Sequence, residues 1–350
     1  MLLPSGIFST TYEQDMGIFK TKTRWGLFLL FLVLLYLFPL YASNYLISFV
    51  TVSAITIVSV YGLNILTGYC GQLSMGHAAF MGVGAYISGI LMVRLQFPWI
   101  LAFLCAGVGS GIVGIIFGLA ALRIKGFYLA VSTLAAQFIL CWAFINLRWL
   151  TGGSEGLKVP PPSIAGFVFD TERSQFLLII TVCVIIAYLC KNISRTRVGR
   201  AFVAVRDNDL AAEVIGINLR FYKPLAFFVC CVFAGFAGSL WGHYIGLVTS
   251  DQFTLDNSIV YLAMLIIGGM GSNVGVIFGV FFMQLLHEAS VIISPILSGI
   301  WINLGAQFFS ALLIALYAVG IILFLIFEPR GLYHRWEILW RSYRLYPYSY

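Results

Sequence analysis

The sequence GQLSMGHAAFMGVGAY, residues 71–86, decides the fold of this chain. It carries small residues and one histidine, His77, where a lipid-facing helix would carry leucine and isoleucine. Small side chains let helix backbones approach one another closely inside a membrane bundle. We therefore expect a helix containing Gly76, Gly82 and Gly84 at the centre of a helical bundle.

The composition of the whole chain agrees with a membrane protein. Hydrophobic residues make up 61% of the 350 residues, and charged residues make up only 9%. Soluble domains carry about 25% charged residues, so this chain lacks a surface suited to water. Apolar runs of about 20 residues can cross a bilayer as helices, whereas the short alternating segments typical of a barrel are not seen.

The apolar runs predict an all-α, polytopic membrane bundle of about ten spans within residues 26–332. The eighth and ninth runs are separated only by residues 268–272, so 257–294 is either two spans or one broken or re-entrant element. Irregular backbone at membrane depth requires cover by protein or water. The expected spans are 26–42, 45–66, 76–93, 98–122, 127–147, 175–190, 224–249, 257–269, 273–294 and 304–327.

Lysine and arginine are distributed unevenly between the two sides of this topology. With an even number of spans, one side holds both termini and sixteen of these residues, and the other side holds four. The positively charged side is cytoplasmic, so segment 1–25 and tail 333–350 are expected in the cytoplasm. The net charge of +7 reflects this topology and does not argue for nucleic acid binding. The four outer residues are Arg94, Arg148, Lys158 and Arg173.

Two hydrophilic loops interrupt the apolar pattern. The outer loop, 148–174, is rich in glycine and proline, which set turns. It is either an ordinary connector or a docking surface for an external solute-binding protein. The inner loop, 191–223, is the longest cytoplasmic segment between spans.

A short helix is expected within the inner loop at 209–217. Asp207 and Asp209 stand at its start and Gly216 at its end, and both are helix-boundary signals. Leu210, Val214 and Ile217 fall on one side at helical spacing. This apolar face either rests on the chain's own helices or the bilayer, or it fits a groove on a partner protein.

The sequence lacks three common enzyme motifs and offers few candidate residues for a chemical site. The sequence has no GxxxxGK[ST] phosphate loop, no HExxH and no GxSxG, so it lacks the signatures of an ATPase or of these hydrolases. Its cysteines and histidines are too scattered to predict a metal site. His287 and Glu288 lie within a predicted span, where ionisable groups are functional candidates or satisfied packing residues.

Several motifs occur in an order that resembles the permease subunits of branched-chain amino acid ABC importers, most closely the larger, LivM-type subunit. The similarity extends over about residues 60–332, through glycine-rich segments and a basic turn. In the cytoplasmic loop, Ala211–Ala212 and Gly216 match the family's Ala–Ala–three residues–Gly pattern, although Leu210 stands where the generic motif has glutamate. The motifs begin at Asn64, Gly71, Arg123, Thr151, Gly199, Gly268 and Glu328.

The resemblance implies a non-enzymatic transport subunit of the cell inner (plasma) membrane that itself binds no cofactor. Its implied partners are a second permease, two cytoplasmic ATPases that use ATP, and an external solute-binding protein. Branched-chain amino acids, or related amino acids and amides, would be the cargo; the alternative is a secondary transporter with an ion or proton site at His287 and Glu288. The expected translocation pathway contains Gln72, Ser74, Gly76, His77, Gly82, Gly268, Gly269 and Gly271. The expected ATPase-coupling residues are Asp209, Leu210, Ala211, Ala212, Glu213, Gly216 and Ile217.

Overall fold

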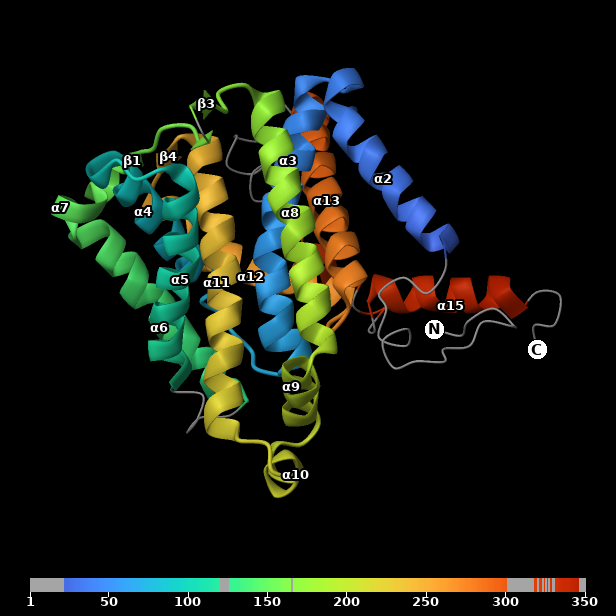
Figure 1. Cartoon of the computed structure of the whole chain (residues 1–350). Coiled ribbons are helices and arrows are strands. Elements are labelled where there is room, and N and C mark those ends of the chain that lie inside the picture. The colour runs from blue at the N-terminus through green and yellow to red at the C-terminus, as the bar shows by residue number, and fades with distance from the viewer. Residues whose placement is uncertain are drawn as a thin grey trace.

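The computed structural model is a bundle of long helices with short elements at its two ends (Figure 1). It describes residues 22–119, 126–164, 166–300 and 331–345, with isolated positions between 318 and 328. The long elements are α2 (Lys22–Tyr41), α3 (Asn44–Leu63) with its π-helical extension η1 (Asn64–Tyr69), α4 (His77–Leu95), α5 (Trp99–Gly118), α6 (Phe127–Asn146), α8 (Glu172–Arg195), α11 (Leu219–Ile245), α12 (Leu255–Gly268), α13 (Asn273–Ile300) and α15 (Leu332–Leu345).

Short elements occupy the connections between these helices. Strand β1 pairs antiparallel with β4, and β2 pairs with β3, so two-residue strands accompany the helices and qualify the all-α expectation. The short elements are α7 (Arg148–Thr151), η3 (Gly153–Glu155), β1 (Leu157–Lys158), β2 (Ser163–Ile164), β3 (Phe167–Val168), α9 (Arg197–Asp207), α10 (Asp209–Val214), β4 (Leu247–Val248) and η4 (Ser250–Gln252).

Six of the described helices are long and apolar enough to cross a membrane, and the chain is a multi-pass helical membrane protein. Predicted spans 26–42 and 273–294 correspond to shorter apolar helices, and 257–269 corresponds to the 14-residue α12. Span 304–327, apart from isolated positions, and residues 1–21 lie outside the described residues. The count of ten and the side of the termini therefore stay predictions. The six helices are Asn44–Tyr69, His77–Leu95, Trp99–Gly118, Tyr128–Asn146, Glu172–Arg195 and Leu219–Ile245.

The length of α12 bears on the ambiguous segment 257–294. At 1.5 Å per residue, a helix of this length extends only about 21 Å, less than the roughly 30 Å of bilayer hydrocarbon. Four residues separate it from α13, and the end of α12 packs against the first turns of α13, where Gly268 lies against Gly275 and Gly279. These dimensions favour a broken or re-entrant element.

The centre of the bundle is formed by α3, α4 and α11. Within their most apolar segments, 72%, 61% and 67% of residues are buried, against 33% in α5 and in α6. The outward faces of α2, α5 and α6 carry exposed leucine, isoleucine and phenylalanine side chains. Such a continuous apolar surface suits lipid or a partner subunit, and the glycine-rich helix α4 is inside the bundle, as the sequence predicted.

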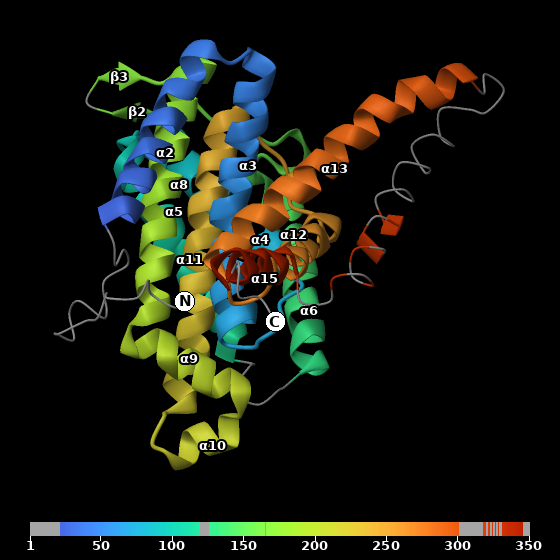
Figure 2. The same cartoon turned by 90° about the vertical axis from the view of Figure 1, so that its right-hand side faces the viewer.

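The two hydrophilic loops lie at opposite ends of the bundle. The segment 148–174, with β1 and β3, is at one end, and α9 and α10 project from the other (Figure 1). Helix α15 runs across the long helices, seen end-on in Figure 2, and Trp336 packs on α13 with its ring 5.8 Å from that of Phe278. Residues 333–350 were expected to be only a tail, and helix α15 was not predicted.

Candidate translocation and coupling site

Helix α4 packs against α11 through glycine, with almost no side chains between the two backbones. A Cβ atom added to Gly84 would lie 2.7 Å from the carbonyl carbon of Gly235, and one added to Gly238 would lie 3.0 Å from the backbone nitrogen of Ala85. Gly235 in turn faces α5, where its added Cβ would be 3.1 Å from the Cα of Gly107. Three helices therefore meet at distances that only glycine permits.

Gly82 is also crowded, but by side chains. An added Cβ would lie 2.8 Å from the ring of Phe144 and 2.9 Å from that of Phe253. Gly82 is therefore not a point of close backbone approach, which is the role expected of the small residues in this helix. The residue faces two aromatic rings, whereas Gly84 and Gly238 make the backbone contacts.

His77 is fully buried at the start of α4 and is held by α3 and α11. Its Nε2 lies 2.9 Å from the carbonyl oxygen of Ser59 and 3.0 Å from that residue's hydroxyl, while its Nδ1 faces the Cys230 thiol at 3.6 Å. Donation from Nε2 to the carbonyl leaves Nδ1 to accept from the thiol, so one neutral tautomer satisfies both sides. In this structure His77 joins three helices.

The segment before α4 holds the other early pathway candidates, and all of them are buried. Gln72 is 6% exposed, and neither atom of its side-chain amide has a hydrogen-bond partner. Ser74 is 1% exposed, and a side chain at Gly76 would collide with the carbonyl oxygen of Thr133. A buried amide without partners is rare and destabilising, so Gln72 is the candidate whose environment most suggests a role beyond packing.

The late glycine cluster forms the sharp connection between α12 and α13. Gly268 lies against Gly275, Gly269 has a φ of 108° and Gly271 a φ of 79°, which side chains disfavour. The backbone N–H of Gly271 donates to Oδ1 of Asn64 in η1 at 2.9 Å. Through this bond the early and late glycine segments, more than 200 positions apart in sequence, lie side by side.

Helix α10, which we call the coupling helix, has well-formed ends. Asn208 is the N-terminal cap, since its side-chain oxygen accepts from the N–H of Ala211 at 3.1 Å. At the other end, Gly216 (φ 91°) donates to the carbonyl of Glu213 and Ile217 donates to that of Ala212, the bonding pattern of a Schellman motif. Gly216 follows the end of the helix, as predicted, and has a left-handed φ, but the N-terminal cap is Asn208 and the last helical residue is Val214.

The apolar face of α10 is not covered by the described part of this chain. Leu210 is 66% exposed, Val214 87% and Ile215 74%. Ile217, which was predicted to share this face, instead packs against the core, because the chain turns at Gly216 before reaching it. Ala212 is buried, whereas Ala211 and Glu213 are exposed.

A cavity of about 360 Å³ opens between the coupling loop and the loop that precedes α4. It brings together Gln72 and Asp209, which sequence reasoning had placed in separate functional sets. Burial raises the pKa of the Cys70 thiol in its wall to about 12. The lining residues are Cys70, Gly71, Gln72, Leu73, Gly126, Leu129, Val205, Arg206, Asp207, Asn208, Asp209 and Lys223.

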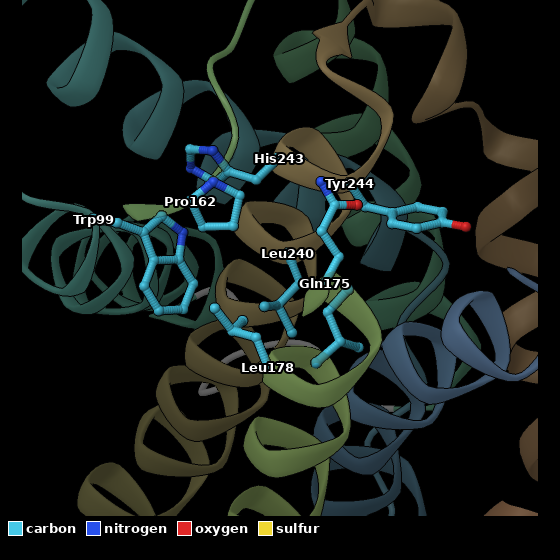
Figure 3. A pocket seen from close by; sticks show the side chains of 8 residues that line it. Trp99, Pro162, Gln175, Leu178, Leu240, His243 and Tyr244 are labelled. Atoms are coloured by element: carbon cyan, nitrogen blue, oxygen red, sulfur yellow. The ribbon is translucent and has the colours of Figure 1, made fainter. Parts of the chain in front are cut away.

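A second cavity, at the opposite end of α11, is too small for a solute (Figure 3). Its space of about 10 Å³ could hold about one water molecule. His243 lies beside it, with its Nδ1 donating to the carbonyl oxygen of Pro160 at 2.9 Å and its ring edge-on to Trp99. We interpret His243 as a residue that fastens the outer loop to α11.

His287 and Glu288 lie on α13, several turns along the helix from the glycine turn that precedes Asn273. The carboxylate of Glu288 accepts a hydrogen bond from the hydroxyl of Tyr45 on α3, and His287 is exposed. No role was predicted for Arg206 and Lys223, which line the cavity, or for Asn64, which joins η1 to the α12–α13 turn. They could not be recognised because their partners are distant in sequence.

Comparison with known proteins gives a consistent set of relatives. A family model described as "Branched-chain amino acid transport system / permease component" matches residues 45–316. The chain is 29% identical over 281 residues to the high-affinity branched-chain amino acid transport system permease protein LivM of Escherichia coli, an alignment covering 73% of this chain and 66% of that protein. The chain thus spans just under two thirds of that LivM protein.

More distant relatives include a second type of permease. Identity is 21% over 268 residues to LivH of Salmonella typhimurium, covering 69% of this chain and 83% of that protein. It is 26% over 238 residues to the autoinducer 2 import system permease protein LsrC of Enterobacter sp. strain 638, covering 66% and 59%. No solved structure matches the chain.

Proposed function

Because the chain belongs to the family of permease components of branched-chain amino acid transport systems, we propose that it is one of two permease subunits of an ATP-driven importer. Its relatives of the LivM and LivH types correspond to two such permeases. Two cytoplasmic ATPases would hydrolyse ATP, and an external solute-binding protein would deliver the cargo. The secondary-transporter alternative is not favoured by these relatives.

The observation that carries this proposal is the exposed apolar face of the coupling helix. Leu210, Val214 and Ile215 project from the end of the bundle opposite the outer loop. A short, capped helix with an uncovered apolar face at a polar end of a membrane protein is suited to a groove on a partner. We assign that partner as an ATPase subunit.

The cargo we propose is a branched-chain amino acid or a related amino acid or amide. The cavity of about 360 Å³ beneath Gln72 falls within the size range of small-molecule sites, and we propose it as the cytoplasmic end of the pathway. The residues near it, Gln72 and Ser74, would line the route together with Gly76 and His77. Gly82 and the turn formed by Gly268, Gly269 and Gly271 would shape the helices around it.

The outer loop lies at the end of the bundle opposite the coupling helix. Residues 148–174 are tied to the bundle by the β1–β4 pair and by His243. The exposed aromatic Phe167 at the tip of the β2–β3 hairpin and exposed Trp149 lie on this side. We propose that this surface receives the solute-binding protein.

The test is reconstitution of the chain in proteoliposomes with a second permease subunit and two ATPase subunits of this transporter family. ATP inside and loaded binding protein outside should drive uptake of radiolabelled leucine, isoleucine or valine. Leu210→Asp should abolish ATPase co-purification and uptake together, because the new carboxylate would be desolvated without a partner. Leu210→Met, which keeps an apolar side chain, should retain both. Uptake that persists without ATPase chains, driven by an ion gradient, would reject the proposal.

A further inference from the structure

Arg206 is the penultimate residue of helix α9, three positions before the coupling helix begins, and its side chain reaches back into the bundle. Its Nη1 donates to the carbonyl oxygen of Gly68 at 2.9 Å, and its Nε and Nη2 lie 3.1 Å from Oδ1 of Asp207. The neighbouring carboxylate therefore orients one edge of the planar guanidinium and directs the remaining nitrogen at Gly68.

The surface that receives Arg206 is fitted to it by two glycines. An added Cβ at Gly71 (φ 71°) would lie 2.7 Å from the Cγ of Arg206 and 3.3 Å from its Cα. An added Cβ at Gly271 (φ 79°) would lie 3.4 Å from its Nη1. Both glycines also have backbone angles that side chains disfavour, so the turns on each side of Arg206 leave space only for the arginine.

Gly68 belongs to η1, the π-helical end of α3. Carbonyl groups in the last turn of a helix lack partners within the helix, and a cation there is favoured by the helix dipole. Arg206 supplies both a donor and a positive charge at this point. Short π-helical insertions are often found at functional sites because they disturb the regular helical register.

From η1 the contacts continue to the connection between α12 and α13. Asn64 opens η1, and its Oδ1 accepts from the N–H of Gly271 at 2.9 Å. Its Nδ2 lies 3.4 Å from Oδ1 of Asn273, the first residue of α13. The coupling loop, η1 and the glycine turn are therefore joined by hydrogen bonds through two side chains, Arg206 and Asn64.

We propose that Arg206 is the positioning residue that transmits displacement of the coupling loop to η1 and to the α12–α13 turn. This inference rests on the proposed function. When the ATPases move α9 and α10, Arg206 pulls on or releases the Gly68 carbonyl, and Asn64 carries the change to Gly271. Without Arg206 the ATPases still attach and hydrolyse ATP, but hydrolysis no longer drives import.

The test compares three variants of the reconstituted complex. Arg206→Met removes the donors while keeping a long side chain, Arg206→Lys restores a charge and one donor position, and Arg200→Met is the control. Arg200 is on the same helix and is exposed, with its Nη1 3.3 Å from the carbonyl oxygen of Arg195. The measurements are ATPase co-purification, hydrolysis stimulated by loaded binding protein, and uptake per ATP hydrolysed.

Arg206→Met should keep co-purification and hydrolysis and lose about tenfold in uptake per ATP, the effect expected from loss of one charge-assisted hydrogen bond. Arg206→Lys should recover part of that loss, and Arg200→Met should behave as wild type. In addition, ATPase association should alter amide hydrogen exchange of residues 64–75 in the wild type and not in Arg206→Met.

Unchanged uptake per ATP in Arg206→Met would overturn the inference while leaving the proposed function standing, provided that the wild-type complex shows ATP-driven uptake. Loss of ATPase attachment together with uptake would also overturn it, because Arg206 would then only hold the loop in shape. A wild type with no ATP-driven uptake would instead count against the proposed function.

Discussion

The Nζ atom of Lys223 lies 3.2 Å from Oδ2 of Asp209 and joins the start of α11 to the coupling helix. The lysine side chain is 7% exposed and the aspartate 22%, so the pair is largely shielded from water. It is a second connection between the coupling loop and the bundle.

Asp209→Asn should destabilise the protein, because it leaves a buried ammonium group without its carboxylate. The expected loss is about 2 kcal/mol, within the range for an unsatisfied buried polar group. The measurement is the melting temperature of the detergent-solubilised protein. The double variant Asp209→Asn/Lys223→Met should recover most of the loss, and strictly additive effects of the two substitutions would show that the pair is not coupled.

Gly216→Val should misdirect the coupling helix without disturbing the spans. A Cβ at Gly216 would meet nothing within 4 Å, so the substitution causes no clash. The strain is in the backbone alone, because a φ of 91° costs a β-branched residue about 1–2 kcal/mol. Stimulation of the ATPases by loaded binding protein should fall. Gly216→Asn should be much milder, because asparagine tolerates this conformation; equal loss in both variants would point to a cause other than backbone angle.

Leucine at Gly84 should be more damaging than leucine at Gly82. At Gly84 the new side chain meets the backbone of α11, which cannot yield, whereas at Gly82 it meets two aromatic rings that can rotate. Overpacking costs about 1–3 kcal/mol, so Gly84→Leu should reduce folded yield and Gly82→Leu should retain part of it. Gly26→Leu, with nothing within 4 Å, is the control for hydrophobicity alone. Size-exclusion chromatography of the solubilised variants measures the difference.

Single cysteines introduced at Lys158 and Asn208 should label from opposite sides of the membrane. The charge bias predicts position 208 in the cytoplasm and position 158 outside, and the structure puts their loops at opposite ends. The background would carry replacements of the seven native cysteines. Labelling of both positions by an impermeant maleimide in intact cells would contradict the orientation.

Local sequence signals predicted much of this architecture. The glycine-rich helix α4 is buried at the centre, and α10 begins at Asp209 and is followed by the left-handed Gly216, because these features depend on side-chain size and backbone angle at single positions. The helical face at Leu210 and Val214 was also predicted. Ile217 was misassigned because helical periodicity was extended past the residue that ends the helix.

Features that depend on tertiary contact were not predictable from these patterns. The N-terminal cap is Asn208, which lies between two aspartates with equally good capping chemistry, and the choice is made by backbone geometry. The π-helical register of η1, the Arg206–Gly68 bond and the Lys223–Asp209 pair each join segments brought together only by folding. Helix α15 was missed because its mixture of aromatic, basic and acidic residues does not resemble a membrane span.

The glycine contacts of α11 with α4 and with α5 have a consequence for movement. Three backbones in direct contact have no layer of side chains whose rotamers could change, so they can neither slide nor compress without collision. Those helices should therefore move as one stiff frame. Any movement that opens this chain first to one side of the membrane and then to the other must therefore take place outside this frame. The places for it are η1, which departs from regular helix, and the turn between α12 and α13.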